Sequence, residues 1–269
     1  MTSGNANKIG KTLKILIIFL MSLITTYSYA QTEKTWFNQA TYTKLEDADT
    51  HTLQLSTHYY FAPQANFWVW DDFGYLDTDT NVLMTFTNDD QSVFTGVEGE
   101  LFISNWFATA NIEDLGDADD NYTIGIGYLF FENLKVSARR QHQSGSDNVI
   151  WLQGQLNFDI DENAYVGTTL ISDDELDNWQ VEVRYFRRLG EQKYFTLDLT
   201  HENSSSKNHN NFIANYYFNQ HFAFGLGSNE SHLLVEGKYF VNHSFFVKAR
   251  YQEQSDDEQS LEMSMQAQF

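Results

Sequence analysis

The chain has 269 residues, of which 37 are acidic and 16 are basic, and its formal net charge is −21 at pH 7. A surface this negative repels phosphate, which disfavours nucleic acid as a partner. With no cysteine there is no disulfide framework, while a single proline and 16% aromatic residues suit long uninterrupted β-strands.

Residues 1–30 have the features of a secretory signal peptide. Three lysines precede an apolar core from Ile15 to Ile24, and the small-residue site Ser28-Tyr29-Ala30 follows. The apolar core has about ten residues, whereas a membrane anchor helix needs about twenty. We therefore expect a cleaved signal and an exported chain of residues 31–269. This chain has 13 basic and 37 acidic residues, which gives a net charge near −24.

The exported chain alternates apolar and polar residues, which is the period of a β-strand. An early example is Leu53 and Leu55 against Gln54 and Ser56, and the same alternation recurs along the whole exported chain. The pattern predicts about sixteen strands of about eight to eleven residues. Merging two short strands near Trp36 or Trp106 would give fourteen.

Aromatic residues close eight of these stretches, at intervals that fit one hairpin each. The connections also alternate in kind, with acidic or polar loops at one end and mostly short turns after the aromatic closures. One connection of the second kind is long: it runs from Ala62 to Thr80 and contains Pro63 and the cluster Phe67–Phe73. It could be a plug, an inward fold or an interfacial anchor. The closures are marked by Tyr60, Phe102, Phe130, Phe158, Phe186, Phe218, Phe240 and Phe269.

Strands of this length are just sufficient to cross a bilayer when tilted, provided that the sheet closes and pairs every backbone group. Aromatic residues at strand ends match the interfacial girdles of membrane barrels. A soluble sandwich or β-helix would place its aromatic residues throughout the strands and its polar face outward. We therefore predict an all-β fold, a transmembrane antiparallel up-and-down barrel. An even strand count places both termini on the periplasmic side and the acidic loops outside.

The closures also resemble a known family. The stretch Tyr59-Tyr60-Phe61-Ala-Pro63, the later Tyr185-Phe186 and Tyr216-Tyr217-Phe218, and the terminal Phe269 are similar to the putative general bacterial porin family of Gram-negative outer membranes. The resemblance implies an outer-membrane barrel that passes small solutes and is a possible homotrimer. It also implies that Phe269 is the signal read by the barrel-assembly machinery. The segment after Pro63 departs from the family in being rich in Trp and Phe.

With about sixteen strands the interior is wide enough for an aqueous channel. A lining that carries both positive and negative charges would orient dipolar solutes and discriminate between ions. Alternatively, the charges are solvated or pair locally, as Glu236 or Lys238 with Lys248 or Arg250. The predicted pore-lining residues are Glu98, Glu100, Lys135, Arg139, Glu182, Arg184, Asp198, Glu236, Lys238, Lys248 and Arg250.

These patterns favour a passive diffusion channel for small hydrophilic solutes and ions, without a cofactor. The acidic loops suggest cation preference at the outer mouth. They could also hold divalent ions that bridge lipopolysaccharide, although a solvated rim explains them as well, and we predict no metal site. The alternatives are a non-conducting barrel that adheres, binds lipopolysaccharide or scaffolds, and a surface hydrolase using His201. We expect no enzyme, because the eight histidines do not follow a catalytic or zinc-binding spacing.

Overall fold

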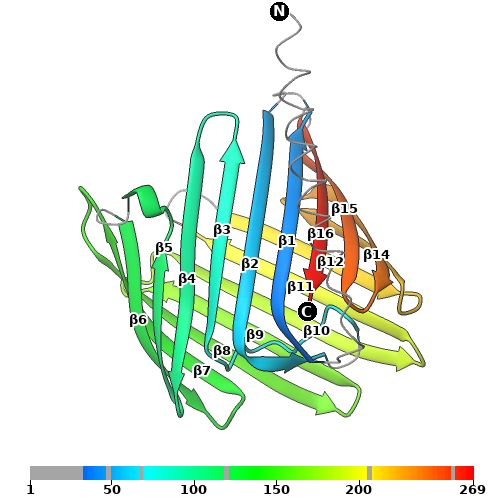
Figure 1. Cartoon of the computed structure of the whole chain (residues 1–269), viewed down its shortest axis with the longest axis horizontal. Coiled ribbons are helices and arrows are strands. Elements are labelled where there is room, and N and C mark those ends of the chain that lie inside the picture. The colour runs from blue at the N-terminus through cyan, green and yellow to red at the C-terminus, as the bar shows by residue number, and fades with distance from the viewer. Residues whose placement is uncertain (1–32, 47–49, 67–68, 118–120, 205–207, 256–257) are drawn as a thin grey trace, which may run out of the picture.

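The computed structural model describes residues 33–46, 50–66, 69–117, 121–204, 208–255 and 258–269 (Figure 1). The predicted signal peptide lies outside these residues. A short 3-10 helix, η1 (Leu115–Asp117), interrupts the strands. The strands are β1 (Glu33–Leu45), β2 (Thr50–Ala65), β3 (Asn81–Asp89), β4 (Val93–Ile103), β5 (Trp106–Ile112), β6 (Asn121–Phe130), β7 (Leu134–Gln143), β8 (Val149–Asp161), β9 (Ala164–Asp173), β10 (Trp179–Gly190), β11 (Lys193–Asn203), β12 (Asn208–Tyr217), β13 (Phe222–Asn229), β14 (His232–Asn242), β15 (Phe245–Ser255) and β16 (Glu258–Gln268).

The strands form a closed antiparallel barrel in which each strand pairs with its neighbours in sequence. Closure joins the first strand to the last, in a register that runs from Phe37↔Gln268 to Leu45↔Ser260. The fold class is thus confirmed, and the strand count is sixteen. Since β1 begins where β16 ends, we call this the terminal end of the barrel (Figure 1).

The two faces of the barrel wall follow the alternation in the sequence. In β13, Phe222, Phe224 and Leu226 point outward and are 42%, 42% and 52% exposed, while the intervening Ala223 is fully buried. The exposed large apolar side chains recur on strand after strand around the barrel. A surface of this kind is stable against lipid, because apolar side chains that face acyl chains carry no hydration penalty and every backbone group is paired within the sheet.

The aromatic doublets that end many strands do not act only as an outer girdle, as the sequence analysis proposed. Tyr239 is 54% exposed on the outside, whereas the next residue, Phe240, is fully buried on the inside. Tyr59 and Tyr60 divide in the same way, at 41% and 7% exposed. The reason is the pleat, because consecutive strand residues face opposite sides. One ring of each of these doublets therefore packs inside the barrel.

The long connection is shorter than its predicted bounds of Ala62 to Thr80. Strand β2 continues through Pro63 to Ala65. This proline falls where the register with β1 shifts, between the pairs Lys34↔Gln64 and Trp36↔Tyr59. A proline at such an irregularity removes no regular ladder hydrogen bond. The connection is thus residues 66–80, of which Phe67 and Trp68 lie outside the described part.

No helix among the described residues is long and apolar enough to cross a membrane.

Candidate functional site

The candidate site is formed where residues 69–80, here called the inward segment, fold into the barrel from the terminal end. Val69 is only 2% exposed and belongs to an aromatic cluster on the interior wall of the barrel, with Trp70 and Tyr75 packed against it. Burial of this apolar surface fixes the segment to the wall. The other buried members of the cluster are Tyr165, Phe186, Tyr194, Tyr217, Ala223, Phe240 and Phe246.

A tight turn positions the middle of the segment. Gly74 has a φ of 92°, a conformation that glycine adopts without strain. Its backbone N–H donates to the Asp72 carboxylate at 3.2 Å, and that carboxylate also accepts from the Tyr165 hydroxyl at 2.9 Å. These bonds hold the buried Asp72 against β9.

Tyr75 docks on β9 in a space left by a glycine. Its hydroxyl lies 2.7 Å from Thr169 Oγ1. A Cβ atom added to Gly167 would lie 2.0 Å from the Tyr75 ring, much closer than two carbon atoms can approach. The inward segment can therefore dock here only because residue 167 is a glycine.

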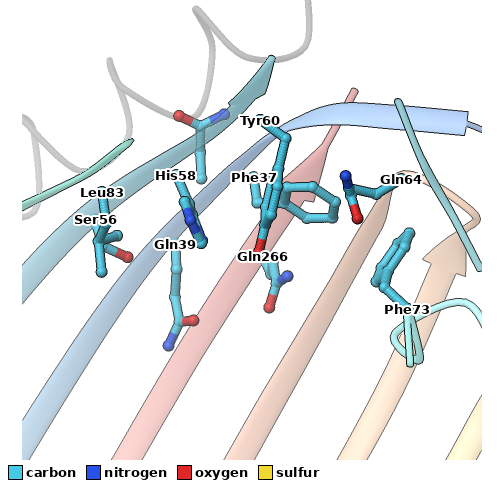
Figure 2. Close-up of a pocket in the computed structure, with 10 residues that line it drawn as sticks. Phe37, Gln39, Ser56, His58, Tyr60, Gln64, Phe73, Leu83 and Gln266 are labelled. Atoms are coloured by element: carbon cyan, nitrogen blue, oxygen red, sulfur yellow. The ribbon is translucent and has the colours of Figure 1, made fainter. Parts of the chain in front are cut away.

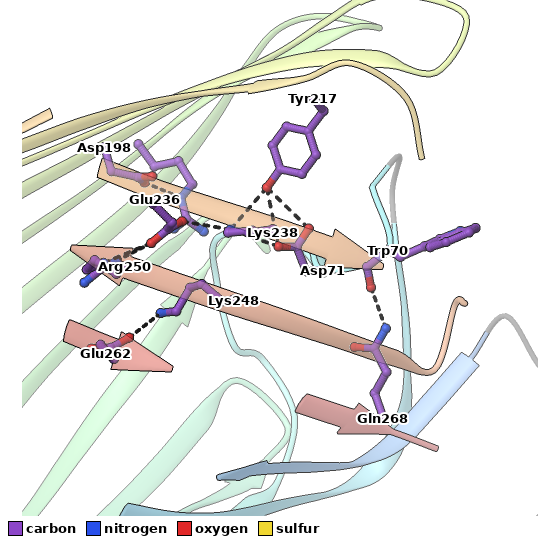
Figure 3. Close-up of polar contacts among 11 residues, drawn as sticks. Trp70, Asp71, Asp198, Tyr217, Glu236, Lys238, Lys248, Arg250, Glu262 and Gln268 are labelled. Atoms are coloured by element: carbon purple, nitrogen blue, oxygen red, sulfur yellow. Dashed lines mark hydrogen bonds and ion pairs between the residues drawn. The ribbon is translucent and has the colours of Figure 1, made fainter. Parts of the chain in front are cut away.

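An ion pair fixes the segment to β14 (Figure 3). Lys238 Nζ lies 3.0 Å from Asp71 Oδ2 and donates to the Tyr217 hydroxyl at 3.3 Å. The Lys238 and Asp71 side chains are 16% and 11% exposed, so the pair is largely removed from water and is screened little by salt. Nearby, Gln268 Nε2 donates to the Trp70 carbonyl at 2.6 Å, which ties the segment to β16.

The same wall carries a chain of alternating charges (Figure 3). Glu236 lies 2.6 Å from Arg250 and 3.7 Å from Lys238, and Lys248 lies 3.0 Å from Glu262. Local pairing of Glu236 with Arg250 was one of the two interpretations that the sequence left open. Glu262 was not among the pore-lining residues predicted from the sequence, although its alternation with Leu261 and Met263 placed it on the interior face.

A second anchor lies on the other side of the barrel. The Asp77 carbonyl accepts from Lys135 Nζ at 3.0 Å, and the Asp77 carboxylate accepts from the Tyr60 hydroxyl at 2.9 Å. Lys135 also pairs with Glu100 at 2.5 Å and lies over the ring of Phe107, 4.8 Å from its centroid. The segment therefore makes contacts on widely separated parts of the wall.

The strand registers place all eleven predicted lining residues on the interior face, opposite the exposed apolar residues. Besides the pairs above, Arg184 Nε lies 2.6 Å from Asp198, Glu182 accepts from Gln180, and Arg139 donates to Gln153. Glu98 lies across from Asn111 in the ladder of β4 and β5.

The inward segment brings interior side chains to the candidate site that the sequence did not assign. The sequence showed a long, aromatic connection, but it did not show which wall Asp71, Asp72 or Tyr75 would contact. His201, the residue named for a hydrolase, lies 2.6 Å from Asn210 through Nδ1, and its ring contacts Trp179. Within the described residues there is no group of three His, Asp or Glu that could hold a metal ion.

A sequence model of the family described as "putative general bacterial porin" matches residues 10–269. The chain belongs to this family. It is an outer-membrane porin, as the resemblance implied. No curated protein sequence matches it.

Solved structures of an outer membrane protein and of a porin share the fold at low sequence identity. The Acinetobacter baumannii outer membrane protein Omp33 is 14% identical, with a TM-score of 0.58 over 88% of this chain and 99% of that one. A triple mutant of the Rhodopseudomonas blastica porin is 9% identical, with a TM-score of 0.55 over 87% of this chain and 99% of that one. At such identity the likeness establishes the barrel fold alone.

Proposed function

We propose that this porin is a passive diffusion channel for small hydrophilic solutes and ions, and that the inward segment forms its narrowest part. The observation that carries the proposal is the position of the segment inside a sixteen-stranded barrel. A barrel of this size encloses an aqueous space, whereas eight strands would be filled by side chains. Segment and wall together bring ionisable groups into that space, which is how a pore selects by size and charge.

Cation preference follows from the distribution of charge around the constriction. Of the eleven predicted lining residues on the strands, five are acidic and six are basic, and Glu262 adds a sixth acidic residue to that face, so these charges cancel. The inward segment adds Asp71, Asp72, Asp77 and Asp79 and has no lysine or arginine. The excess of negative charge therefore resides in the segment, in addition to the acidic loops at the opposite end.

The reversal potential in a potassium chloride gradient tests this preference. We expect wild-type protein to favour potassium, and Asp77→Asn/Asp79→Asn to lower the potassium-to-chloride permeability ratio by about 2- to 5-fold per charge, from the Coulomb energy of unit charges about 8 Å apart in water. The matched control is Asp174→Asn/Glu175→Gln in the connection between β9 and β10, which should change the ratio less. Anion preference of the wild type would refute the proposal.

A second candidate function is a non-conducting barrel with an adhesive, lipopolysaccharide-binding or scaffolding role. The observation in its favour is that the inward segment reaches several sides of the interior wall. Single-channel recording separates the two candidates, because a plugged wild-type barrel would give no current steps. The segment contacts β1 through Phe37, β2 through Tyr60, β7 through Lys135, β9 through Thr169, β14 through Lys238 and β16 through Gln268.

The remaining proposals concern export and assembly. We propose that residues 1–30 are removed, so that N-terminal sequencing of the protein from outer membranes should begin at Gln31. Phe269 is proposed as the assembly signal. Its carbonyl accepts from the backbone N–H groups of Thr35 and Trp36, at 2.7 and 3.0 Å, at the seam where the barrel closes.

A homotrimer is proposed on the family resemblance, and cross-linking in native membranes tests it. A hydrolase ranks last, and activity on peptide or lipid substrates that His201→Ala abolishes would support it.

A further inference from the structure

A cavity of about 320 Å³ lies in the interior wall, beside the inward segment and away from the ion pairs of β14 to β16. Its wall is built from β1, β2, β3 and β16, and Phe73 of the inward segment covers one side (Figure 2). A volume of this size is in the range of sites that take small organic ligands. The cavity is distinct from the charged constriction in its chemistry.

The lining of the cavity has no aspartate, glutamate, lysine or arginine. It consists of aromatic rings, a histidine, a serine hydroxyl, a leucine and carboxamide side chains, among them Gln39, Gln64 and Gln266. A carboxamide both donates and accepts hydrogen bonds. A neutral lining of this kind can satisfy a neutral polar solute, but it cannot neutralise an ionic group that loses water on entry.

Several of these polar groups retain hydrogen-bonding capacity. Gln39 uses Nε2 to donate to Thr41 at 2.9 Å, which leaves Oε1 as an acceptor. Within the described residues, neither the Gln266 carboxamide nor the Ser56 hydroxyl has a hydrogen-bond partner. All three residues line the cavity (Figure 2). They form a set of donors and acceptors suited to a solute with several hydroxyls.

Aromatic rings form the other part of the lining. The Phe37 ring lies edge to face with Phe73, at 4.8 Å between centroids, and with Tyr60, at 5.5 Å. The Tyr60 hydroxyl is already engaged by Asp77, so its ring is held in place. Such rings offer flat apolar surface to the C–H face of a solute whose edges carry hydroxyls.

We infer that this cavity is a binding subsite for a small neutral polyhydroxylated solute, of the class of a monosaccharide. This inference rests on the proposed channel function, since it names a class of solute that the channel passes. The solute would exchange water for carboxamide and hydroxyl partners along its edges and place its apolar face on Phe37 or Phe73. A charged derivative of the same ring is disfavoured, because its charge would be desolvated without a partner.

The test is equilibrium binding to full-length mature protein in detergent micelles, measured by ligand-detected saturation-transfer NMR. The probes are D-glucose, anionic D-glucuronate and protonated D-glucosamine. We expect glucose to bind saturably and both charged derivatives to bind more weakly. The cationic derivative is the stricter comparison, because the net negative charge of the protein would favour it if charge alone decided.

Two variants locate the binding. Gln39→Ala/Gln266→Ala removes two hydrogen-bonding groups and should weaken glucose binding about tenfold or more. Gln155→Ala, an interior glutamine of β8 outside the cavity, is the matched control and should leave binding unchanged. No saturable glucose binding by the wild type, equal or tighter binding of either charged derivative, or equal loss in the two variants would each overturn the inference. Failure of the channel proposal is seen separately, as absence of potassium chloride current in bilayers from the same preparation.

Discussion

The docking of Tyr75 on β9 gives the sharpest perturbation of the constriction. In Gly167→Ala the new methyl group would overlap the Tyr75 ring, whose nearest atom is 2.0 Å from the Cβ position, so the ring must leave. The change forfeits the hydrogen bond to Thr169, about 1 kcal/mol, and the burial of a half-buried ring, about 1 to 2 kcal/mol. A loss of about 2 to 3 kcal/mol corresponds to a shift of about 30- to 160-fold toward the undocked segment.

Single-channel recording measures the consequence. We expect Gly167→Ala to give larger or noisier current steps than the wild type, because the middle of the inward segment is no longer held on the wall. The matched control is Gly154→Ala on the neighbouring strand β8, where an added Cβ meets nothing within 4 Å. Unchanged currents in Gly167→Ala, or the same change in both variants, would show that Tyr75 docking does not define the pore.

Three further variants test the segment anchor, the lipid face and assembly. Lys238→Met leaves Asp71 without its ammonium partner, and breaking a buried pair costs about 3 to 5 kcal/mol. A cysteine introduced at Leu76 should therefore react with maleimide faster in Lys238→Met than in the control Lys248→Met, whose ion pair does not involve the segment. Equal labelling rates would argue against the anchor. Ile126→Lys places a charge on the lipid face and should lower the free energy of unfolding in vesicles by about 2 to 4 kcal/mol, measured by urea titration, whereas a similar cost for the interior Thr123→Lys would contradict the assigned faces. Deletion of Phe269 removes the proposed assembly signal and the bonds of its carbonyl at the seam, so the amount of protein in outer membranes should fall, and wild-type amounts would refute that role.

The barrel could be predicted from the sequence because its geometry is local and periodic. In β14 and β15, alternation alone assigned Glu236 and Lys238 to one face and Val235 to the other, and in the ladder with β15 Glu236 pairs with Arg250 and Val235 with Tyr251. A closed sheet then follows from the need to pair every backbone group in lipid. The aromatic doublets were interpreted too simply, because the same alternation that was applied within the strands also applies to the two residues of each doublet.

The inward segment could not be predicted, because it has no period and its contacts are distant in sequence. The bond between Lys238 and Asp71 spans 167 positions, and the bond between Gln268 and Trp70 spans 198. Which residues become partners over such distances depends on the circumference of the barrel and on which strands lie beside the inward segment. The glycine that admits Tyr75 is likewise one among several strand glycines, and only the assembled structure shows that Gly167 is the one that the Tyr75 ring approaches.

The most direct test of the account compares single-channel conductance of the wild type with that of a variant in which a flexible Gly-Ser linker replaces residues 66–79. Strands β2 and β3 pair up to Tyr60↔Asn81, and β2 continues to Ala65, so the linker is made just long enough to return from Ala65 to Thr80 without disturbing the ladder. We predict a small, cation-preferring conductance for the wild type and a larger, less selective one for the variant. Equal conductance in the two proteins, or no conductance in either, would contradict a channel whose narrowest part is formed by the inward segment.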